Sequence, residues 1–209
     1  MPIVATFTQP FNTRIHIWHC IEPENELLKA LTLTDRSLSR LQQMKSESHR
    51  MCFLAVRQIL LIEGFQDGDL IYDENGKPSL KNGLYVSISH SHLAATLAIS
   101  EQPIGVDIEL IRDKIANIDF KFSSEPFLLE RRLSPNYISE LTVVWGVKEA
   151  LFKIVNQVGI SYKNDILVST FEITDGQTKA VWTHLGLQRH FNVSFAQWDQ
   201  WMLVWVFEI

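Results

Sequence analysis

The sequence predicts an α+β fold made of two similar halves that meet near residue 101. Each half opens with a segment of strand character, continues through a helical region and ends in paired strand-like segments. No direct sequence repeat is visible, so the similarity is expected in the order of elements. The chain has 209 residues, of which 46% are hydrophobic, and this is enough for one large domain or two small ones. The predicted domains are residues 1–100 and 101–209.

Composition excludes several classes of function. The net charge is −5 and no long block of like charge occurs, which argues against a general nucleic-acid-binding protein. No window reaches the roughly eighteen apolar residues of a membrane span, and the N-terminus lacks the pattern of a signal peptide. We therefore expect a cytoplasmic protein without a membrane partner. Cys20 and Cys52 lie in different elements, so we expect two buried thiols.

The first half is expected to alternate strands with helices. Residues 14–20 alternate apolar and polar side chains and predict an opening strand, and residues 24–30 predict a short helix. Thr34 and Asp35 can cap a longer helical tract over residues 36–63, which Gly64 ends. Residues 73–78 predict a turn, because an Asn-Gly pair favours positive φ angles and the ring of the following Pro fixes the φ angle of that residue. Residues 84–100 predict two strands with a polar corner at residues 89–92.

The second half begins with a strand at residues 104–109. Residues 110–136 mix Phe with Arg and Lys, which suits an acidic partner with apolar pockets, although the Phe residues could equally be core. Residues 136–155 predict a helix, and Gly159 follows its end. A strand at residues 166–174, a turn at residues 175–176 and further strand-like runs to residue 209 predict a terminal antiparallel group, in which the Trp residues are core or edge packing.

Three acids and a lysine form the strongest chemical pattern. Asp107 and Glu109 project from one face of the predicted strand, which the alternation with Val106 and Ile108 predicts to be half-buried. Two like charges on that face repel unless a positive group lies between them. A set of carboxylates suits Mg²⁺, which keeps waters and substrate oxygens among its ligands. Glu149 and Lys153 lie one turn apart on the predicted helix. Taken alone, either pair could be a solvated surface.

Longer strings around these residues resemble a known family. Gly105-Val-Asp107-Ile-Glu109 and Trp145-x-x-Lys148-Glu149-Ala-x-x-Lys153 resemble the two signature motifs of the 4′-phosphopantetheinyl transferases. The chain length and a Gly-Lys-Pro string at residues 76–78 resemble the larger, surfactin-synthetase-activating class. The resemblance implies a pseudo-twofold duplicated fold with the active site between its halves. It also implies transfer of the 4′-phosphopantetheine arm of coenzyme A to a carrier-protein serine, with release of adenosine 3′,5′-bisphosphate.

The resemblance assigns roles to particular residues. Mg²⁺ would be bound by Asp107, Glu109 and Glu149, with Glu149 also the candidate base and Lys153 the group that stabilises the transition state. Expected coenzyme A contacts are Lys45, Arg50, Lys77, Pro78, Ser89, His90 and Lys148. The string from Phe122 to Glu125 is compressed relative to the family pattern, so no role is carried over to Glu125.

The expected partners are coenzyme A and an apo acyl or peptidyl carrier protein, which in this family meets the region of residues 110–136. The larger class implies a monomer. Two alternatives remain open at this point: a coenzyme A or carrier-protein binding module without turnover, and a metal-dependent nucleotide phosphohydrolase. The reaction product separates the three functions.

Overall fold

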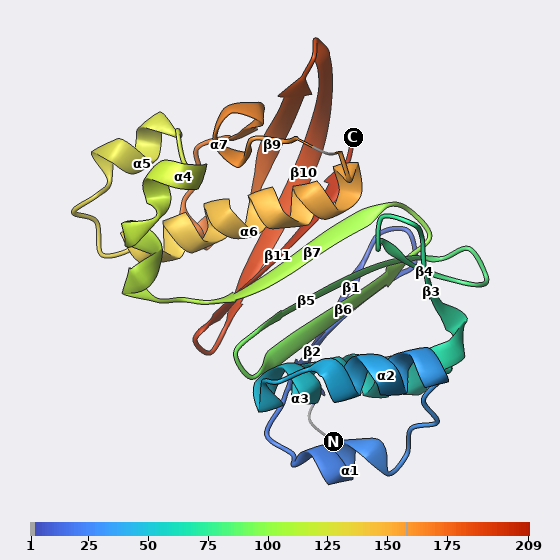
Figure 1. Ribbon diagram of the computed structural model, residues 1–209. Coiled ribbons are helices and arrows are strands. Elements are labelled where there is room, and N and C mark those ends of the chain that lie inside the picture. The colour runs from blue at the N-terminus through green and yellow to red at the C-terminus, as the bar shows by residue number, and fades with distance from the viewer. Residues whose placement is uncertain (1–2, 158) are drawn as a thin grey trace. The chain divides into compact units, whose positions relative to one another are not determined.

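The computed structural model describes residues 3–157 and 159–209. The chain divides into two compact units, Met1–Gln102 and Pro103–Ile209, and each has its own antiparallel sheet and its own hydrophobic core (Figure 1). The predicted α+β class is confirmed, with both sheets antiparallel.

The first unit is a six-stranded sheet with helices packed against it. Its strand order is β1-β2-β6-β5-β4-β3, and α3 packs on β6 and β2. Its elements are β1 (Ile3–Gln9), β2 (Thr13–His19), α1 (Glu24–Leu28), α2 (Asp35–Gln43), α3 (Glu47–Ile62), β3 (Leu70–Tyr72), β4 (Pro78–Leu80), β5 (Tyr85–Ser91) and β6 (Ala94–Ser100).

The helical tract predicted over residues 36–63 is in fact two helices. The cap at Thr34 is confirmed, because its hydroxyl accepts a hydrogen bond from the Ser37 amide at 3.3 Å. Helix α2 ends after Gln43, and Ser46 starts α3 by accepting a hydrogen bond from the His49 amide at 3.4 Å. A second N-cap residue, Ser46, therefore divides the tract. Strand β1, which precedes the predicted opening strand, was not expected from the sequence.

The two thiols are buried as predicted. Cys20 and Cys52 are fully enclosed in the core of the first unit, with their sulfur atoms 3.5 Å apart.

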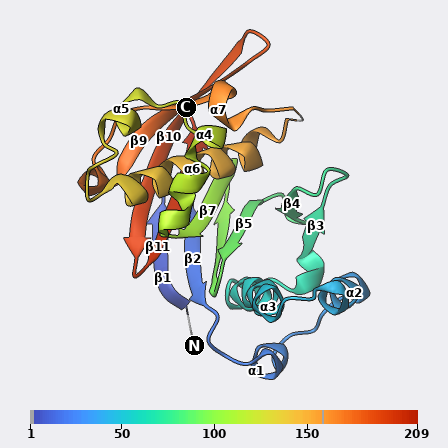
Figure 2. The ribbon, with the colours of Figure 1, turned by 60° about the vertical axis from the view of Figure 1, so that its left-hand side comes forward.

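The second unit is a five-stranded sheet crossed by one long helix. Its strand order is β7-β11-β10-β9-β8, and α6 contacts β7 and β11. Figure 2 shows α4, α5 and α7 gathered at α6. Its elements are β7 (Ile104–Leu110), α4 (Asp119–Phe122), α5 (Pro126–Glu130), α6 (Tyr137–Val155), α7 (Tyr162–Asp165), β8 (Ile166–Val168), β9 (Gln177–His184), β10 (Leu187–Trp198) and β11 (Trp201–Glu208).

The predicted strand and helix of the second unit are present, with two corrections. The strand at residues 166–174 is shorter, since β8 ends at Val168. Strand β7 is buried on both faces rather than half-buried: Val106, Asp107 and Ile108 are all enclosed. Asp107 is therefore an acid inside the protein, and its charge must be compensated there. Among the described residues, no helix has the length and apolar character that a membrane crossing requires.

Candidate active site

Two glycines allow helix α6 to lie directly on the sheet. A Cβ at Gly105 of β7 would stand 1.8 Å from the carbonyl oxygen of Ala150, and one at Gly146 of α6 would stand 2.8 Å from the Val204 side chain in β11. Neither position has room for a side chain. Because side chains alternate along a strand, Asp107 and Glu109 project from the same face as Gly105 and therefore meet α6. The glycines thus bring the acids of β7 against the acid and lysine of α6.

Asp107 and Lys153 form an ion pair at this junction. The lysine Nζ lies 2.9 Å from Asp107 Oδ1 and also donates a 2.8 Å hydrogen bond to the carbonyl of Val106. The carboxylate is 3% exposed, whereas the lysine is only partly buried. Lys153 therefore compensates a buried negative charge and remains accessible to a ligand.

Glu149 lies beside this pair. Burial, followed by the negative charge of Asp107, raises the pKa of the Glu149 carboxyl above its ordinary value, while Lys153 and a hydrogen bond from Tyr162 act in the opposite direction. A carboxylate with a raised pKa is a better proton acceptor than an exposed one. The environment of Glu149 therefore suits a general base.

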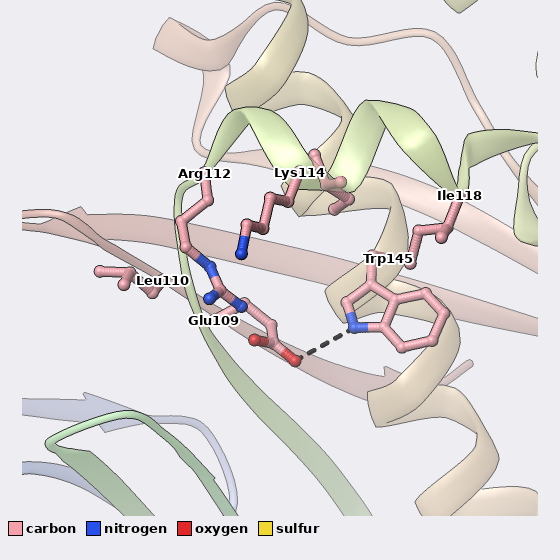
Figure 3. A pocket seen from close by; sticks show the side chains of 7 residues that line it. Glu109, Leu110, Arg112, Lys114, Ile118 and Trp145 are labelled. Atoms are coloured by element: carbon pink, nitrogen blue, oxygen red, sulfur yellow. Dashed lines mark hydrogen bonds between the residues drawn. The ribbon is translucent and has the colours of Figure 1, made fainter.

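Glu109 lines a pocket of about 230 Å³ in the second unit. The indole Nε1 of Trp145 donates a 3.1 Å hydrogen bond to Glu109 Oε1, which fixes this acid against α6 (Figure 3). Arg112 and Lys114 follow β7 and line the same pocket. Two cations, an acid and an indole therefore share one small cavity, which can hold an anionic group against an apolar wall.

The donor atoms at the junction suit a hard cation. All three acids offer carboxylate oxygens, and the repulsion between Asp107 and Glu149 is what a bound cation would relieve. Over residues 3–157 and 159–209, however, no group of three or more Asp, Glu, His or Cys side chains is gathered closely enough to hold a metal ion. Instead, Lys153 forms an ion pair with Asp107, and Trp145 donates a hydrogen bond to Glu109. Since Mg²⁺ commonly takes only one or two carboxylates besides phosphate oxygens and water, the residues fit it without forming a closed cage.

Lys148, expected to contact coenzyme A, has a different place. It is fully buried, and its Nζ donates to the carbonyls of Phe122, Tyr162 and Ile166 at 2.7, 3.0 and 2.9 Å. Glu125 Oε1 lies 2.7 Å from the same nitrogen. All three N–H donors of an ammonium group are thus used inside the core. The described structure therefore places Lys148 in the core, where it has no exposed surface to offer a ligand, and does not bring it together with the other predicted coenzyme A contacts.

The first unit contains a pocket of about 240 Å³ rich in cationic and aromatic groups. His90, a predicted coenzyme A contact, lies at the end of β5 and lines it. The other side chains around it are Arg40, Met44, His49, Cys52, Phe53, Val56, Arg57, Tyr72 and Ile88. The His49 and His90 rings lie 5.2 Å apart, and the Arg40 guanidinium stands 5.7 Å from the centre of the Tyr72 ring. This combination suits a phosphate-bearing aromatic ligand.

The remaining predicted contacts lie outside the described lining of this pocket. Lys45 is exposed between α2 and α3, and Arg50 donates to Glu24 Oε2 at 2.8 Å and to the Met44 carbonyl at 3.1 Å. Lys77 and Pro78 lie at the β3–β4 turn, where the Lys77 amide donates to Asp73. Ser89 is half-buried in β5.

Several residues of this pocket were missed as ligand candidates. Arg40, His49 and Arg57 lie in the helical tract predicted over residues 36–63, but only the structure shows that they share one cavity. Tyr72 carried no signal in the sequence, since it reaches the pocket from the short strand β3.

The resemblance to phosphopantetheinyl transferases predicted that acids of a strand and an acid and a lysine of a helix form one site, and strand β7 and helix α6 carry these residues. Comparison with known proteins confirms that resemblance. The chain is 30% identical over 115 residues to 4′-phosphopantetheinyl transferase gsp of Aneurinibacillus migulanus, and the match covers 52% of this chain and 45% of that relative. It thus spans about half the length of the curated relative, and no family model matches the chain.

Proposed function

We propose that this chain transfers the 4′-phosphopantetheine arm of coenzyme A to a serine hydroxyl of an apo carrier protein and releases adenosine 3′,5′-bisphosphate. The observation that carries the proposal is the junction of β7 and α6, where the Asp107–Lys153 ion pair lies beside an acid of raised pKa. The homology to a 4′-phosphopantetheinyl transferase supports the same reaction.

Glu149 would accept the proton of the attacking serine. As the serine oxygen bonds to the β-phosphorus of coenzyme A, the bond from that phosphorus to the bridging oxygen breaks, and the electron pair leaves with the 3′,5′-bisphosphate. Burial and the nearby Asp107 charge make the Glu149 carboxylate a stronger base than an exposed one. Removing one such group typically costs on the order of 3 kcal/mol of barrier, or about a hundredfold in rate.

Lys153 would stabilise charge on the pyrophosphate. Two of its hydrogen bonds in the described structure go to Val106 and Asp107, and an ammonium group has a third N–H to offer a phosphate oxygen. Asp107, Glu109 and Glu149 would hold Mg²⁺ together with substrate oxygens, and bound Mg²⁺ would neutralise the nonbridging phosphate oxygens.

The pocket of the first unit is our candidate for the nucleotide end of coenzyme A. Arg40, His49 and His90 would contact phosphate oxygens, and Tyr72 offers an aromatic face for adenine. Lys45, Arg50, Lys77, Pro78 and Ser89 stay predicted contacts around it. Arg50 would have to exchange its ion pair with Glu24 for a phosphate, which lowers its expected contribution.

The carrier protein is proposed to meet the segment between β7 and α6. The Phe residues of this segment divide between core and surface: Phe122 and Phe127 are buried, whereas Phe120 is 61% exposed. With Arg112 and Lys114 nearby in sequence, the exposed Phe suits an acidic partner with apolar pockets. We further propose that the two units repeat one duplicated architecture and that the protein acts as a monomer.

Intact-mass spectrometry tests the reaction directly. Apo acyl carrier protein and an apo peptidyl carrier protein are each incubated with the enzyme, coenzyme A and Mg²⁺. We expect a gain of about 340 Da on the carrier, the mass of the arm added to serine, with adenosine 3′,5′-bisphosphate as the second product. EDTA and the Glu149→Gln variant should each reduce the rate at least about a hundredfold.

The same reaction mixture separates the alternatives. Coenzyme A binding without any mass gain on either carrier would support the binding-module function. Release of inorganic phosphate or a nucleotide in the absence of a carrier would support the phosphohydrolase function.

A further inference from the structure

Tyr162, the first residue of α7, lies over the face of α6 that carries Glu149. Trp145, Glu149 and Phe152 recur at i, i+4 and i+7 and therefore share one side of the helix. The Tyr162 ring centroid is 5.8 Å from that of Trp145 and 5.8 Å from that of Phe152. A ring in contact with both neighbours must lie beside the residue between them. The geometry thus brings the phenol to Glu149.

The backbone of Tyr162 is held in place by hydrogen bonds. Its carbonyl accepts a 3.0 Å hydrogen bond from Lys148, which is held by Glu125 in the core. The Ser161 hydroxyl accepts a hydrogen bond from the Asn164 amide at 3.2 Å and caps the turn that begins with Tyr162. Lys148 and Glu149 are neighbours on α6, so one holds the backbone of Tyr162 while the other meets its side chain. The phenol therefore has little freedom to move relative to the helix.

The Tyr162 hydroxyl is a hydrogen-bond partner of the Glu149 carboxylate. A tyrosine phenol is protonated at neutral pH, so its hydroxyl donates to the carboxylate. Asp107 repels the same carboxylate while Lys153 attracts it. Asp107 and Lys153 therefore act on Glu149 as opposing charges, whereas the phenol offers it a directed hydrogen bond.

We propose that Tyr162 is a positioning residue that holds the Glu149 carboxylate in the orientation in which it binds the metal ion and receives the serine proton. This inference rests on the proposed function, because it takes Glu149 as metal ligand and base. Groups that hydrogen-bond a metal-ligating carboxylate from outside the coordination shell typically change metal affinity or activity by about 10- to 100-fold when removed. Tyr162 would belong to this kind of group, and its signature would be a change in metal affinity.

The test removes one hydroxyl and keeps the ring. Tyr162→Phe is compared with Tyr137→Phe, a matched control that deletes a phenol donating a 3.0 Å hydrogen bond to Asp119 in the same unit. Mn²⁺ replaces Mg²⁺ as an oxygen-seeking ion visible by electron paramagnetic resonance, and its dissociation constant is measured with and without coenzyme A. Transfer kinetics on the carrier supply kcat and KM, and melting temperatures report folding.

We expect Tyr162→Phe to raise the Mn²⁺ dissociation constant about tenfold and to lower kcat about tenfold, with KM for the carrier within about twofold of wild type. Tyr137→Phe should leave all three values unchanged. Wild-type Mn²⁺ affinity in Tyr162→Phe would overturn the proposal, as would a wild-type protein that binds no Mn²⁺ in either condition. A wild type that binds Mn²⁺ but transfers nothing would refute the proposed function, and the Mn²⁺ affinities alone would then decide the role of Tyr162.

Discussion

Lys148 and Glu125 are an ion pair with neither side chain exposed to solvent. Burial, the largest influence, lowers the pKa of the lysine, and the Glu125 charge acts against that. The carboxylate is also satisfied, since Ser123 and the Ser124 amide each donate to Glu125 Oε2 at 2.9 Å. A buried pair with this many partners is costly to break from one side, because the remaining charge is left uncompensated.

We therefore expect Lys148→Met to lower the free energy of unfolding by about 3–5 kcal/mol. Urea unfolding followed by tryptophan fluorescence measures this, because five of the six Trp residues lie in the second unit. Lys163→Met is the matched control: it removes a partly exposed lysine whose exposed hydrogen bond to the Phe120 carbonyl is 2.9 Å long, and should cost no more than about 1 kcal/mol. Adding Glu125→Gln to Lys148→Met should restore part of the loss. Equal stability of Lys148→Met and wild type would contradict the structural role.

The sequence held a signal for the burial of Lys148. Val144 and Leu151 lie four residues before it and three after, both fully buried, so Lys148 falls on the apolar stripe of α6. Lys153 lies on another side of the helix and meets Asp107. The family motif contains both lysines and does not separate these roles. The partner Glu125 could not be predicted, because it comes from a separate short segment whose position depends on tertiary contacts.

Asp67 joins two helices of the first unit. Its carboxylate accepts hydrogen bonds at 2.8 Å from both the amide and the hydroxyl of Thr34, and at 2.8 Å from Ser37 Oγ, at the start of α2. It also accepts from Arg57 Nε of α3 at 3.1 Å. Burial alone would raise the pKa of Asp67, but these hydrogen bonds outweigh it and hold the pKa below its ordinary value of 3.8. The ionised form therefore stabilises the fold.

A carboxyl group whose pKa is lower in the folded state than in the unfolded state stabilises the fold. This stabilisation is fully present above the unfolded-state pKa and is lost as the pH falls through the folded-state pKa. We expect Asp67→Asn to lower the free energy of unfolding by about 3 kcal/mol at pH 7, because buried Arg57 loses its counter-charge. The difference from wild type should shrink below pH 3.8, where the unfolded-state Asp is protonated. Urea unfolding followed by far-ultraviolet circular dichroism, repeated from pH 3 to pH 7, measures both effects.

Asp69→Asn serves as the control for Asp67. Asp69 lies in the same short 3₁₀ turn and accepts an exposed hydrogen bond from the Gln66 amide at 2.8 Å. Its loss should cost about 1 kcal/mol. A pH-independent effect of Asp67→Asn would show that its charge contributes nothing.

Elements with strong local signals were predicted well, and those that depend on distant partners were not. The helix at residues 136–155 and the cap at Thr34 follow from periodicity and capping chemistry. The burial of both faces of β7 was missed, because alternation of Val106 and Ile108 with acids is normally the mark of a solvated face. Only the close approach of α6, which Gly105 permits, turns that face into an interior one.

At the scale of the whole molecule, each unit offers a different kind of chemistry. The cationic and aromatic pocket belongs to the first unit, whereas the three acids and Lys153 belong to the second. The sequence predicted this division of nucleotide contacts from metal and catalytic residues, and it stays a prediction. Its consequence is that the affinities for coenzyme A and for metal respond to different substitutions.

His90→Ala and Glu149→Gln test that division as a pair. We expect His90→Ala to raise the dissociation constant for coenzyme A about tenfold, measured by calorimetry in EDTA. This is the change expected when one hydrogen bond to a charged phosphate is lost. Its Mn²⁺ affinity without coenzyme A should stay within about twofold of wild type. Glu149→Gln should show the reverse, with Mn²⁺ affinity reduced more than about tenfold and coenzyme A affinity in EDTA retained. A pocket that binds only the nucleotide should not affect Mn²⁺ binding in the absence of coenzyme A. If His90→Ala weakens Mn²⁺ binding as much as it weakens coenzyme A binding, nucleotide binding and metal binding are therefore not carried by separate units.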